Sequence, residues 1–283
     1  MKIIDSHHHF WKYSAAEYGW IDDSMACLRK DFLPKDLKAA LHASHVHSAV
    51  SVQARQTVEE TRWLLEHAEG HAYIAGVVGW APLADPKIGD FLDEWKNRTK
   101  LRGLRHVVQG ESDPDFLSRP DFNRGIEVLT SRNLVYDLLI RESQLEAASH
   151  FVDRHPHQRF ILDHAAKPKI KDREIEPWKR NISDLAKRDN VAVKLSGLVT
   201  EADFSKWTEE ELRPYMETVL DAFGTDRILF GSDWPVCLAA STYPRWKKTV
   251  ESFTEALSDF EKEKIFGRNA IGWYGLKFFP KIL

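Results

Sequence analysis

The chain has 283 residues, of which 43% are hydrophobic and 29% charged, with a formal net charge of −3 at pH 7. This composition predicts a globular protein with a sizeable core and no electrostatic field that would draw it to nucleic acid or an anionic membrane. No apolar run approaches the ~18 residues that span a bilayer, and no long apolar segment follows Met1, so we expect a cytoplasmic protein without a signal peptide.

Short apolar runs recur along the chain and are typical of strands that are buried on both faces. The first covers residues 2–5 and leads into the polar stretch SHHHFW. Seven further runs follow at 49–54, 74–80, 104–108, 135–140, 159–165, 191–196 and 228–233.

An amphipathic stretch with apolar residues at helical spacing follows each of these runs. Thr57 and Glu60 form a capping-box pattern at the start of the second helix. Pro120 is suited to open the fourth helix and Gly224 to end the seventh. A last short helix is expected near residues 269–274.

Regular alternation of strands and helices predicts an α/β fold with a parallel sheet. We expect a single-domain (β/α)8 TIM barrel over residues 1–283. The alternative is a doubly wound open sheet, but that fold calls for a Gly-rich phosphate loop after an early strand, and the sequence has none. Catalytic groups of (β/α)8 barrels lie at the C-terminal ends of the strands, so this rule sorts the polar residues.

Two histidines follow the first strand run at a spacing that places them together. In extended backbone, His7 and His9 point to one face and His8 to the other. Further polar residues end later runs and fall at the same rim: Arg105, His106, His164, Lys194, Ser196 and Asp233. His45 and His47 precede the second run, so we expect them at the opposite rim in a structural role.

Imidazoles and a carboxylate are the ligands that a zinc-like cation prefers. His7, His9, His164 and Asp233 are therefore a candidate metal site. Asp233 is also a candidate general base, with a pKa lowered by a metal or a protonated histidine. The structural alternatives are a helix-capping role for Asp233 and a buried core position for His164.

The remaining polar residues at this rim need partners. Lys194 lies within an apolar run, so it requires an anionic partner, either a group of the site or Asp233. A Schiff-base role for this lysine has no other support in the sequence. Arg105 and His106 are adjacent, so only one of them can point fully into the barrel.

Aromatic and thiol side chains also fall in the loops at this rim. Trp11, Trp80 and Trp234 either wall a pocket or pack beneath the loops. Cys27 and Cys237 are too few for a disulfide framework and predict free thiols. They follow the first and last strands, which are neighbours in a closed barrel, so the two loops are expected to be close.

Eight segments occur in order along nearly the whole chain: DSHHHFW, VVGWAPL, LRGLRH, YDLL, ILDHAAKP, KLSGLVTEAD, ILFGSDWPV and IFGRNAIGWYGL. Together they resemble the amidohydrolase superfamily, of the amidohydrolase 2 type. Within it they are similar to the branch of sugar lactonases that includes L-fuconolactonases and L-rhamnonolactonases. The motifs are specific for the branch and not for one sugar.

The resemblance implies a (β/α)8 barrel that hydrolyses an aldonolactone to its open-chain acid. It places His7, His9, His164 and Asp233 in the catalytic site, with Asp233 activating water. It also implies substrate contacts from the segments around the later strands: Arg105, His106, Lys194, Glu201 and Trp234, to which the rim position adds Trp11.

Departures from the wider superfamily limit the metal content. Binuclear members carry a bridging lysine on the fourth strand and a histidine on the fifth, whereas this chain has Arg105-His106 and VYDLLI there. We therefore expect no binuclear centre, and either one divalent cation, with zinc preferred, or none. Two other functions stay open: a zinc-dependent decarboxylase or hydrolase of an unsaturated or aromatic acid, and a non-enzymatic ligand-binding barrel. Assembly into a homo-oligomer is not decided by the sequence.

Overall fold

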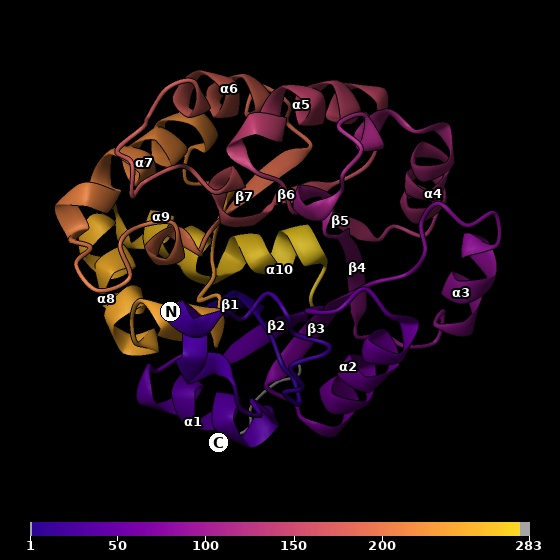
Figure 1. Ribbon diagram of the computed structural model, residues 1–283, viewed down its shortest axis with the longest axis horizontal. Helices are drawn as coiled ribbons and strands as arrows, with labels where there is room; N and C mark the ends of the chain where they lie inside the picture. The colour runs from indigo at the N-terminus through magenta and orange to yellow at the C-terminus, as the bar shows by residue number, and fades with distance from the viewer. Residues whose placement is uncertain (1, 278–283) are drawn as a thin grey trace.

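The computed structural model describes residues 2–277 and shows a barrel of parallel strands in sequence order, with helices around the outside (Figure 1). The predicted (β/α)8 fold is therefore confirmed. The strands are β1 (Ile4–His8), β2 (Ser48–Val52), β3 (Ile74–Gly79), β4 (Leu101–His106), β5 (Val135–Leu138), β6 (Phe160–Leu162), β7 (Val191–Leu195) and β8 (Ile228–Phe230).

A helix follows each strand, as the amphipathic stretches predicted. These helices are α1 (Pro34–Ala43), α2 (Val58–Gly70), α3 (Ile88–Glu94), α4 (Pro120–Ser131), α5 (Leu145–Arg154), α6 (Trp178–Leu185), α7 (Glu209–Phe223) and α8 (Tyr243–Phe253). Two short helices, α9 (Asp259–Glu263) and α10 (Asn269–Tyr274), complete the described chain. No helix within residues 2–277 is long and apolar enough to cross a membrane.

The barrel closes at the C-terminal ends of its first and last strands. His8 and Trp234 form a parallel bridge. The amide of Asp233 donates to the carbonyl of His7 at 2.8 Å, and the amide of His9 donates to the carbonyl of Trp234 at 2.7 Å. The backbone that closes the barrel thus carries four predicted site residues: His7, His9, Asp233 and Trp234.

The two ends of the barrel interior differ in chemistry. Apolar side chains form a cluster in the barrel interior, beneath the polar residues at the C-terminal rim: Ile4, Val50, Val52, Val78, Val135, Ile161, Ala192 and Leu229. Helix α10 crosses the N-terminal end of the barrel and adds Ala270 and Tyr274 to the same cluster (Figure 1). At this rim His47 Nδ1 accepts a hydrogen bond from the amide of Ile3 at 3.2 Å, which is the structural role predicted for that histidine.

Strands β5 and β8 end at Leu138 and Phe230, short of the predicted residues 140 and 233, and three further local predictions need correction. Strand β4 begins at Leu101 rather than 104, and it contains Gly103, where a Cβ atom would lie 2.6 Å from the carbonyl oxygen of Val135. Strand β6 ends at Leu162 rather than 165, because the next residues turn into a left-handed conformation. Only half of the capping box forms: Thr57 accepts from the amide of Glu60, whose carboxylate turns away to the loop after β2.

Candidate active site

The histidine pair at the end of β1 has the predicted arrangement. The Nε2 atoms of His7 and His9 lie 3.1 Å apart, while His8 points away to the hydroxyl of Ser51 at 2.8 Å. His9 Nδ1 lies 2.8 Å from the carbonyl oxygen of Val52. A carbonyl only accepts, so His9 carries its proton on Nδ1 and presents the Nε2 lone pair to the site.

His164 follows β6 in an unusual backbone conformation. Residues 164–167 have φ values of +53°, +48°, +59° and +53°, a left-handed turn built without glycine. Its Nδ1 lies 2.8 Å from the hydroxyl of Ser196 at the end of β7. The neighbouring Gly197 has φ +66°, and a Cβ there would lie 2.5 Å from His164 Nδ1. The glycine therefore allows the imidazole to lie against the backbone of the next strand.

Asp233 also has a positive φ, of +56°. The two turns that carry His164 and Asp233 are held by indoles of the helices that follow them. Trp178 Nε1 donates to the carbonyl of Ala165 at 2.7 Å, and Trp246 Nε1 donates to the carbonyl of Gly231 at 2.8 Å. Strained backbone persists where surrounding contacts over-determine it, and it concentrates at functional sites.

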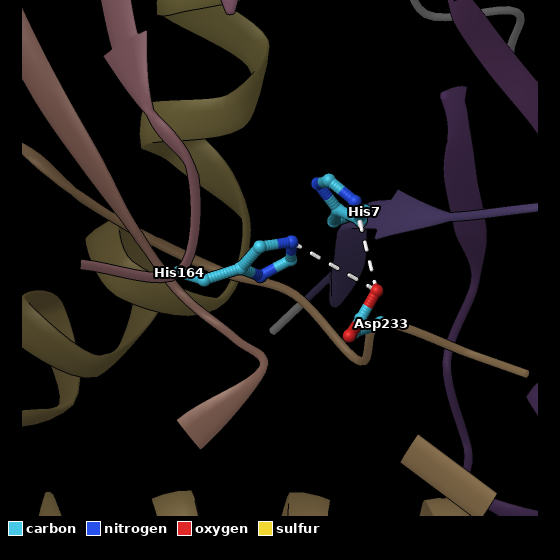
Figure 2. Close-up of side chains that lie close together, drawn as sticks. All are labelled: His7, His164 and Asp233. Atoms are coloured by element: carbon cyan, nitrogen blue, oxygen red, sulfur yellow. Dashed lines mark ion pairs between the residues drawn. The ribbon is translucent and has the colours of Figure 1, made fainter. Parts of the chain in front are cut away.

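These side chains converge on one carboxylate oxygen. Asp233 Oδ1 lies 3.4 Å from His9 Nε2, 3.7 Å from His7 Nε2 and 4.0 Å from His164 Nε2. Figure 2 shows the contacts with His7 and His164, made across the mouth of the barrel. All four predicted residues are brought together and are almost fully buried.

Burial and charge act in opposite directions on the ionisation of this cluster. Burial raises the pKa of the Asp233 carboxyl, but its electrostatic interactions with His164, His9 and Lys167 outweigh burial, so the pKa lies below its ordinary value. Burial lowers the pKa of His164 to about 4, against the pull of Asp233. An ionised Asp233 carboxylate therefore faces the neutral imidazole of His164 at neutral pH.

The donor set fits a single divalent cation. The ligand atoms of His7, His164 and Asp233 lie within 4.8 Å of one another, and His9 Nε2 lies 3.1 Å from that of His7. Four ligands at ~2.0 Å around zinc are separated by about 3.3 Å. The hydrogen bonds of two imidazoles agree with metal binding. Nδ1 of His9 faces the Val52 carbonyl and Nδ1 of His164 faces the Ser196 hydroxyl, so both Nε2 atoms point into the site as possible ligands.

Beneath His7 lies a fully buried ionic cluster that sequence reasoning missed in part. Asp163 accepts from Arg105 Nη1 at 2.9 Å, and its other oxygen lies 2.8 Å from Lys194 Nζ and 3.3 Å from His7 Nδ1. Asp137 also pairs with Lys194 and accepts from the hydroxyl of Tyr274 at 2.7 Å. Strand alternation could have predicted the position of Asp163. Ile161 points into the barrel, and Asp163 lies two residues later, on the same face of the strand.

Arg105 is the member of its pair that points inward. Its guanidinium binds Asp163 and Gln53, and Nη1 lies 3.4 Å from His7 Nε2. His106 instead turns to the loop after β4, where Nε2 lies 2.6 Å from Glu111 and the ring stacks on Phe116. The prediction that only one of the two enters the barrel is confirmed.

Besides Arg105, three predicted substrate contacts have little or no free surface. Lys194 is fully buried below His7, and its partners are Asp137 and Asp163 rather than Asp233. Trp11 is fully buried and donates from Nε1 to the carbonyl of Lys30 at 2.9 Å. It therefore anchors the loop after β1.

Trp234 is 4% exposed and packs edge-on against Phe32. It thus lies between the last strand and the loop that Trp11 anchors. Cys27 and Cys237 are free, and Cys27 Sγ donates to the carbonyl of Leu238, so the loops after β1 and β8 are adjacent as predicted.

Glu201 lies at the mouth of the site. Its carboxylate is 3.5 Å from Lys167 Nζ, and both side chains are partly exposed. Lys167 was not predicted, although its charge contributes to the lowered pKa of Asp233. The pair offers a donor and an acceptor beside the buried cluster.

Comparison with known proteins agrees with this fold. The amidohydrolase family model matches residues 4–276. The chain is 41% identical to the L-fucono-1,5-lactonase of Burkholderia multivorans, covering 96% of both proteins. It is 34% identical to the L-fucono-1,5-lactonase of Burkholderia ambifaria, covering 96% of this chain and 94% of that one.

A solved structure extends the agreement to three dimensions. The crystal structure of an amidohydrolase from Burkholderia multivorans with bound zinc superposes with a TM-score of 0.95 at 41% identity, covering 98% of this chain and 100% of that one. With the family match over nearly the whole barrel, these findings show that the chain belongs to the amidohydrolase family.

Proposed function

We propose that this protein is a lactonase that hydrolyses a sugar-derived 1,5-lactone, of the L-fucono-1,5-lactone kind, to the open-chain aldonic acid. The observation that carries the proposal is the buried Asp233 carboxylate, which has a lowered pKa and faces three imidazoles at the C-terminal end of the barrel. The near full-length similarity to two L-fucono-1,5-lactonases supports the choice of substrate class.

Asp233 acts as the general base in this proposal. It takes a proton from a water molecule as the water oxygen bonds to the lactone carbonyl carbon, and the carbonyl oxygen gains negative charge. Collapse of the tetrahedral species breaks the ring C–O bond, and the departing alkoxide takes the proton back from Asp233. The carboxylate is thereby restored for the next turnover.

The imidazoles orient the reacting groups. The hydrogen bond between His164 Nδ1 and Ser196 keeps Nε2 directed at Asp233, where it can hold the attacking water. His7, His9, His164 and Asp233 would hold one zinc ion, which would supply Lewis-acid polarisation of the carbonyl and a lowered pKa for bound water. His9, fixed on the Val52 carbonyl, keeps its Nε2 facing the same point.

The rim supplies contacts to the sugar. Lys167 and Glu201 are partly exposed and can donate to and accept from ring hydroxyls. Trp11 and Trp234 act indirectly, by fixing the loops that form the wall. The two free thiols suit a reducing compartment, so we place the reaction in the cytoplasm.

A panel of aldonolactones with a pH indicator tests the proposal, because each turnover releases an acid. We expect turnover of at least one 1,5-lactone, and a loss of about 10²- to 10⁴-fold in kcat for Asp233→Asn. Asp189→Asn removes an exposed carboxylate on the outside of the barrel and should leave kcat unchanged. Near wild-type turnover by Asp233→Asn would rule out its role as the base, and no turnover of any lactone would rule out the lactonase.

A further inference from the structure

A second polar cavity lies at the opposite end of the barrel from the catalytic cluster. It has a volume of about 420 Å³ and is bounded by the start of β4, the segments before β5 and β6, and the end of α10. No acidic side chain is among the described residues that line it. Its basic lining is Lys96, Arg98, Arg102, Arg132, Arg159 and Lys277.

Two of these cations have carboxylate partners. Arg98 pairs with Glu69 and Arg132 with Asp93, both at 2.5 Å. Within residues 2–277, the other four basic side chains of the cavity have no carboxylate within 4.0 Å, and they leave an excess of positive charge around it: Lys96, Arg102, Arg159 and Lys277.

Arg102 is the most unusual of the four. Its side chain is half-buried and packs on the backbone of β3, where a Cβ at Gly76 would lie 2.8 Å from Arg102 Cγ. Its buried Nε has no hydrogen-bond partner in the described chain, and neither has Nη2 of Arg98. Burial without a compensating anion lowers the pKa of Arg102. Buried donors in native proteins are normally paired, and a buried unpaired charge is costly.

We propose that this cavity binds a phosphate-type dianion between Arg102, Arg159, Lys96 and Lys277. The planar guanidinium fork matches the geometry of phosphate oxygens, and it would satisfy the orphaned nitrogens. Four uncompensated cations favour a dianion over a monocarboxylate. The ligand is either free inorganic phosphate or the phosphoryl group of a metabolite, since both present the same oxygens.

Titration of the full-length protein with inorganic phosphate, at ionic strength held constant with sodium chloride, tests the site by calorimetry. We expect saturable binding by the wild type and at least 10-fold weaker binding by Arg102→Met. Arg102→Lys, which keeps the charge and loses the fork, should be intermediate. Arg180→Met removes an exposed cation from α6 and should bind as the wild type does. Lactone turnover without phosphate should be the same in all four proteins.

Two further measurements complete the test. If Arg102→Met does not fold, the double variant Lys96→Met/Lys277→Met, which changes two exposed side chains, should show the same loss of phosphate affinity. A parallel titration with a hexose 6-phosphate identifies the source: tighter binding indicates a phosphorylated metabolite and equal binding indicates free phosphate, and either supports the site. No saturable binding, or equal phosphate affinity in wild type, Arg102→Met and Arg180→Met, would overturn the proposal.

Discussion

Asp163 determines how His7 faces the catalytic site. His7 Nδ1 lies near both an ammonium donor, Lys194, and a carboxylate acceptor, Asp163. Donation from Nδ1 to Asp163 leaves the Nε2 lone pair for the site, and the positive charge of Lys194 is held by Asp137 and Asp163. Asp163 is thus a positioning residue that does not itself contact the substrate.

We expect Asp163→Asn to lower zinc affinity and kcat together by about 10- to 100-fold, because the carboxylate that orients a proposed zinc ligand, His7, is lost. Zinc affinity is measured by competition with a chelating dye, independently of activity. Tyr274→Phe is the matched control: it removes one hydrogen bond to Asp137 and should cost about 1 kcal/mol of stability while leaving zinc affinity unchanged. Equal zinc affinity in wild type and Asp163→Asn would contradict the positioning role.

We expect Trp246 to be a second residue that affects catalysis indirectly. Its indole holds the carbonyl of Gly231, two residues before Asp233. Trp246→Phe keeps an aromatic ring but leaves this buried carbonyl without its donor. We expect about 1–3 kcal/mol of destabilisation and a fall in kcat larger than the change in KM. Trp20→Phe, at a side chain that is 44% exposed, should change neither. Unaltered kinetics in the Trp246 variant would show that the turn keeps its conformation without the indole hydrogen bond.

Among the elements of the barrel, the turns that follow β6 and β8 do more than the strands themselves to position His164 and Asp233. The turn after β6 carries four consecutive non-glycine residues in the left-handed region, and the turn after β8 carries another at Asp233. Each such residue costs about 1–3 kcal/mol, which the packing of the following helix must offset. Helices α6 and α8 therefore stabilise these turns through the hydrogen bonds that Trp178 and Trp246 donate to them.

Gly197→Ala tests the fit between the β6 and β7 turns. The new Cβ would lie 2.5 Å from His164 Nδ1 in a residue with φ +66°, so the imidazole must move and we expect at least a 10-fold loss of kcat. Gly89→Ala introduces the same methyl group into α3 with no atom within 4 Å, and should stabilise the protein by up to about 1 kcal/mol. Full activity in Gly197→Ala would mean that the position of His164 is not critical.

At the scale of the whole molecule, stability should depend on pH through Glu60. Burial raises the pKa of this carboxyl to about 7, against hydrogen bonds from the amides of Arg55 and Ala54 that lower it. The folded state then holds the proton more tightly than the unfolded state, where the pKa is near 4.5. This contribution is full below about pH 4.5 and is lost as the pH rises to about 7.

We therefore expect Glu60→Gln to lose less stability between pH 5 and 7 than the wild type, by on the order of 2–3 kcal/mol. The measurement is urea unfolding at both pH values. Glu59→Gln changes the exposed neighbouring carboxylate and should follow the wild-type pH dependence. Parallel pH profiles for wild type and Glu60→Gln would show that Glu60 titrates as it does in water.

The amino-acid sequence was sufficient to predict the barrel and the four side chains of the proposed catalytic site. Apolar runs alternating with amphipathic stretches admit few topologies, and parallel strands place all their C-terminal ends at one rim, so His7, His9, His164 and Asp233 could be grouped without coordinates. The short helix at Asn269–Tyr274 was also predictable, because local spacing and a terminal glycine define it.

The partners of the buried charges could not be predicted from the sequence and are known only from the folded structure. Asp163 and Asp137 pair with Lys194 across the barrel. These contacts depend on the barrel radius and on the strand register, and the local pattern of residues predicts neither quantity. The left-handed turn after β6 could not be predicted for a related reason. It is stabilised by Trp178 from the following helix, and it contains no glycine that would indicate a left-handed conformation. Local periodicity specifies which elements form, whereas long-range contacts specify what each polar side chain meets.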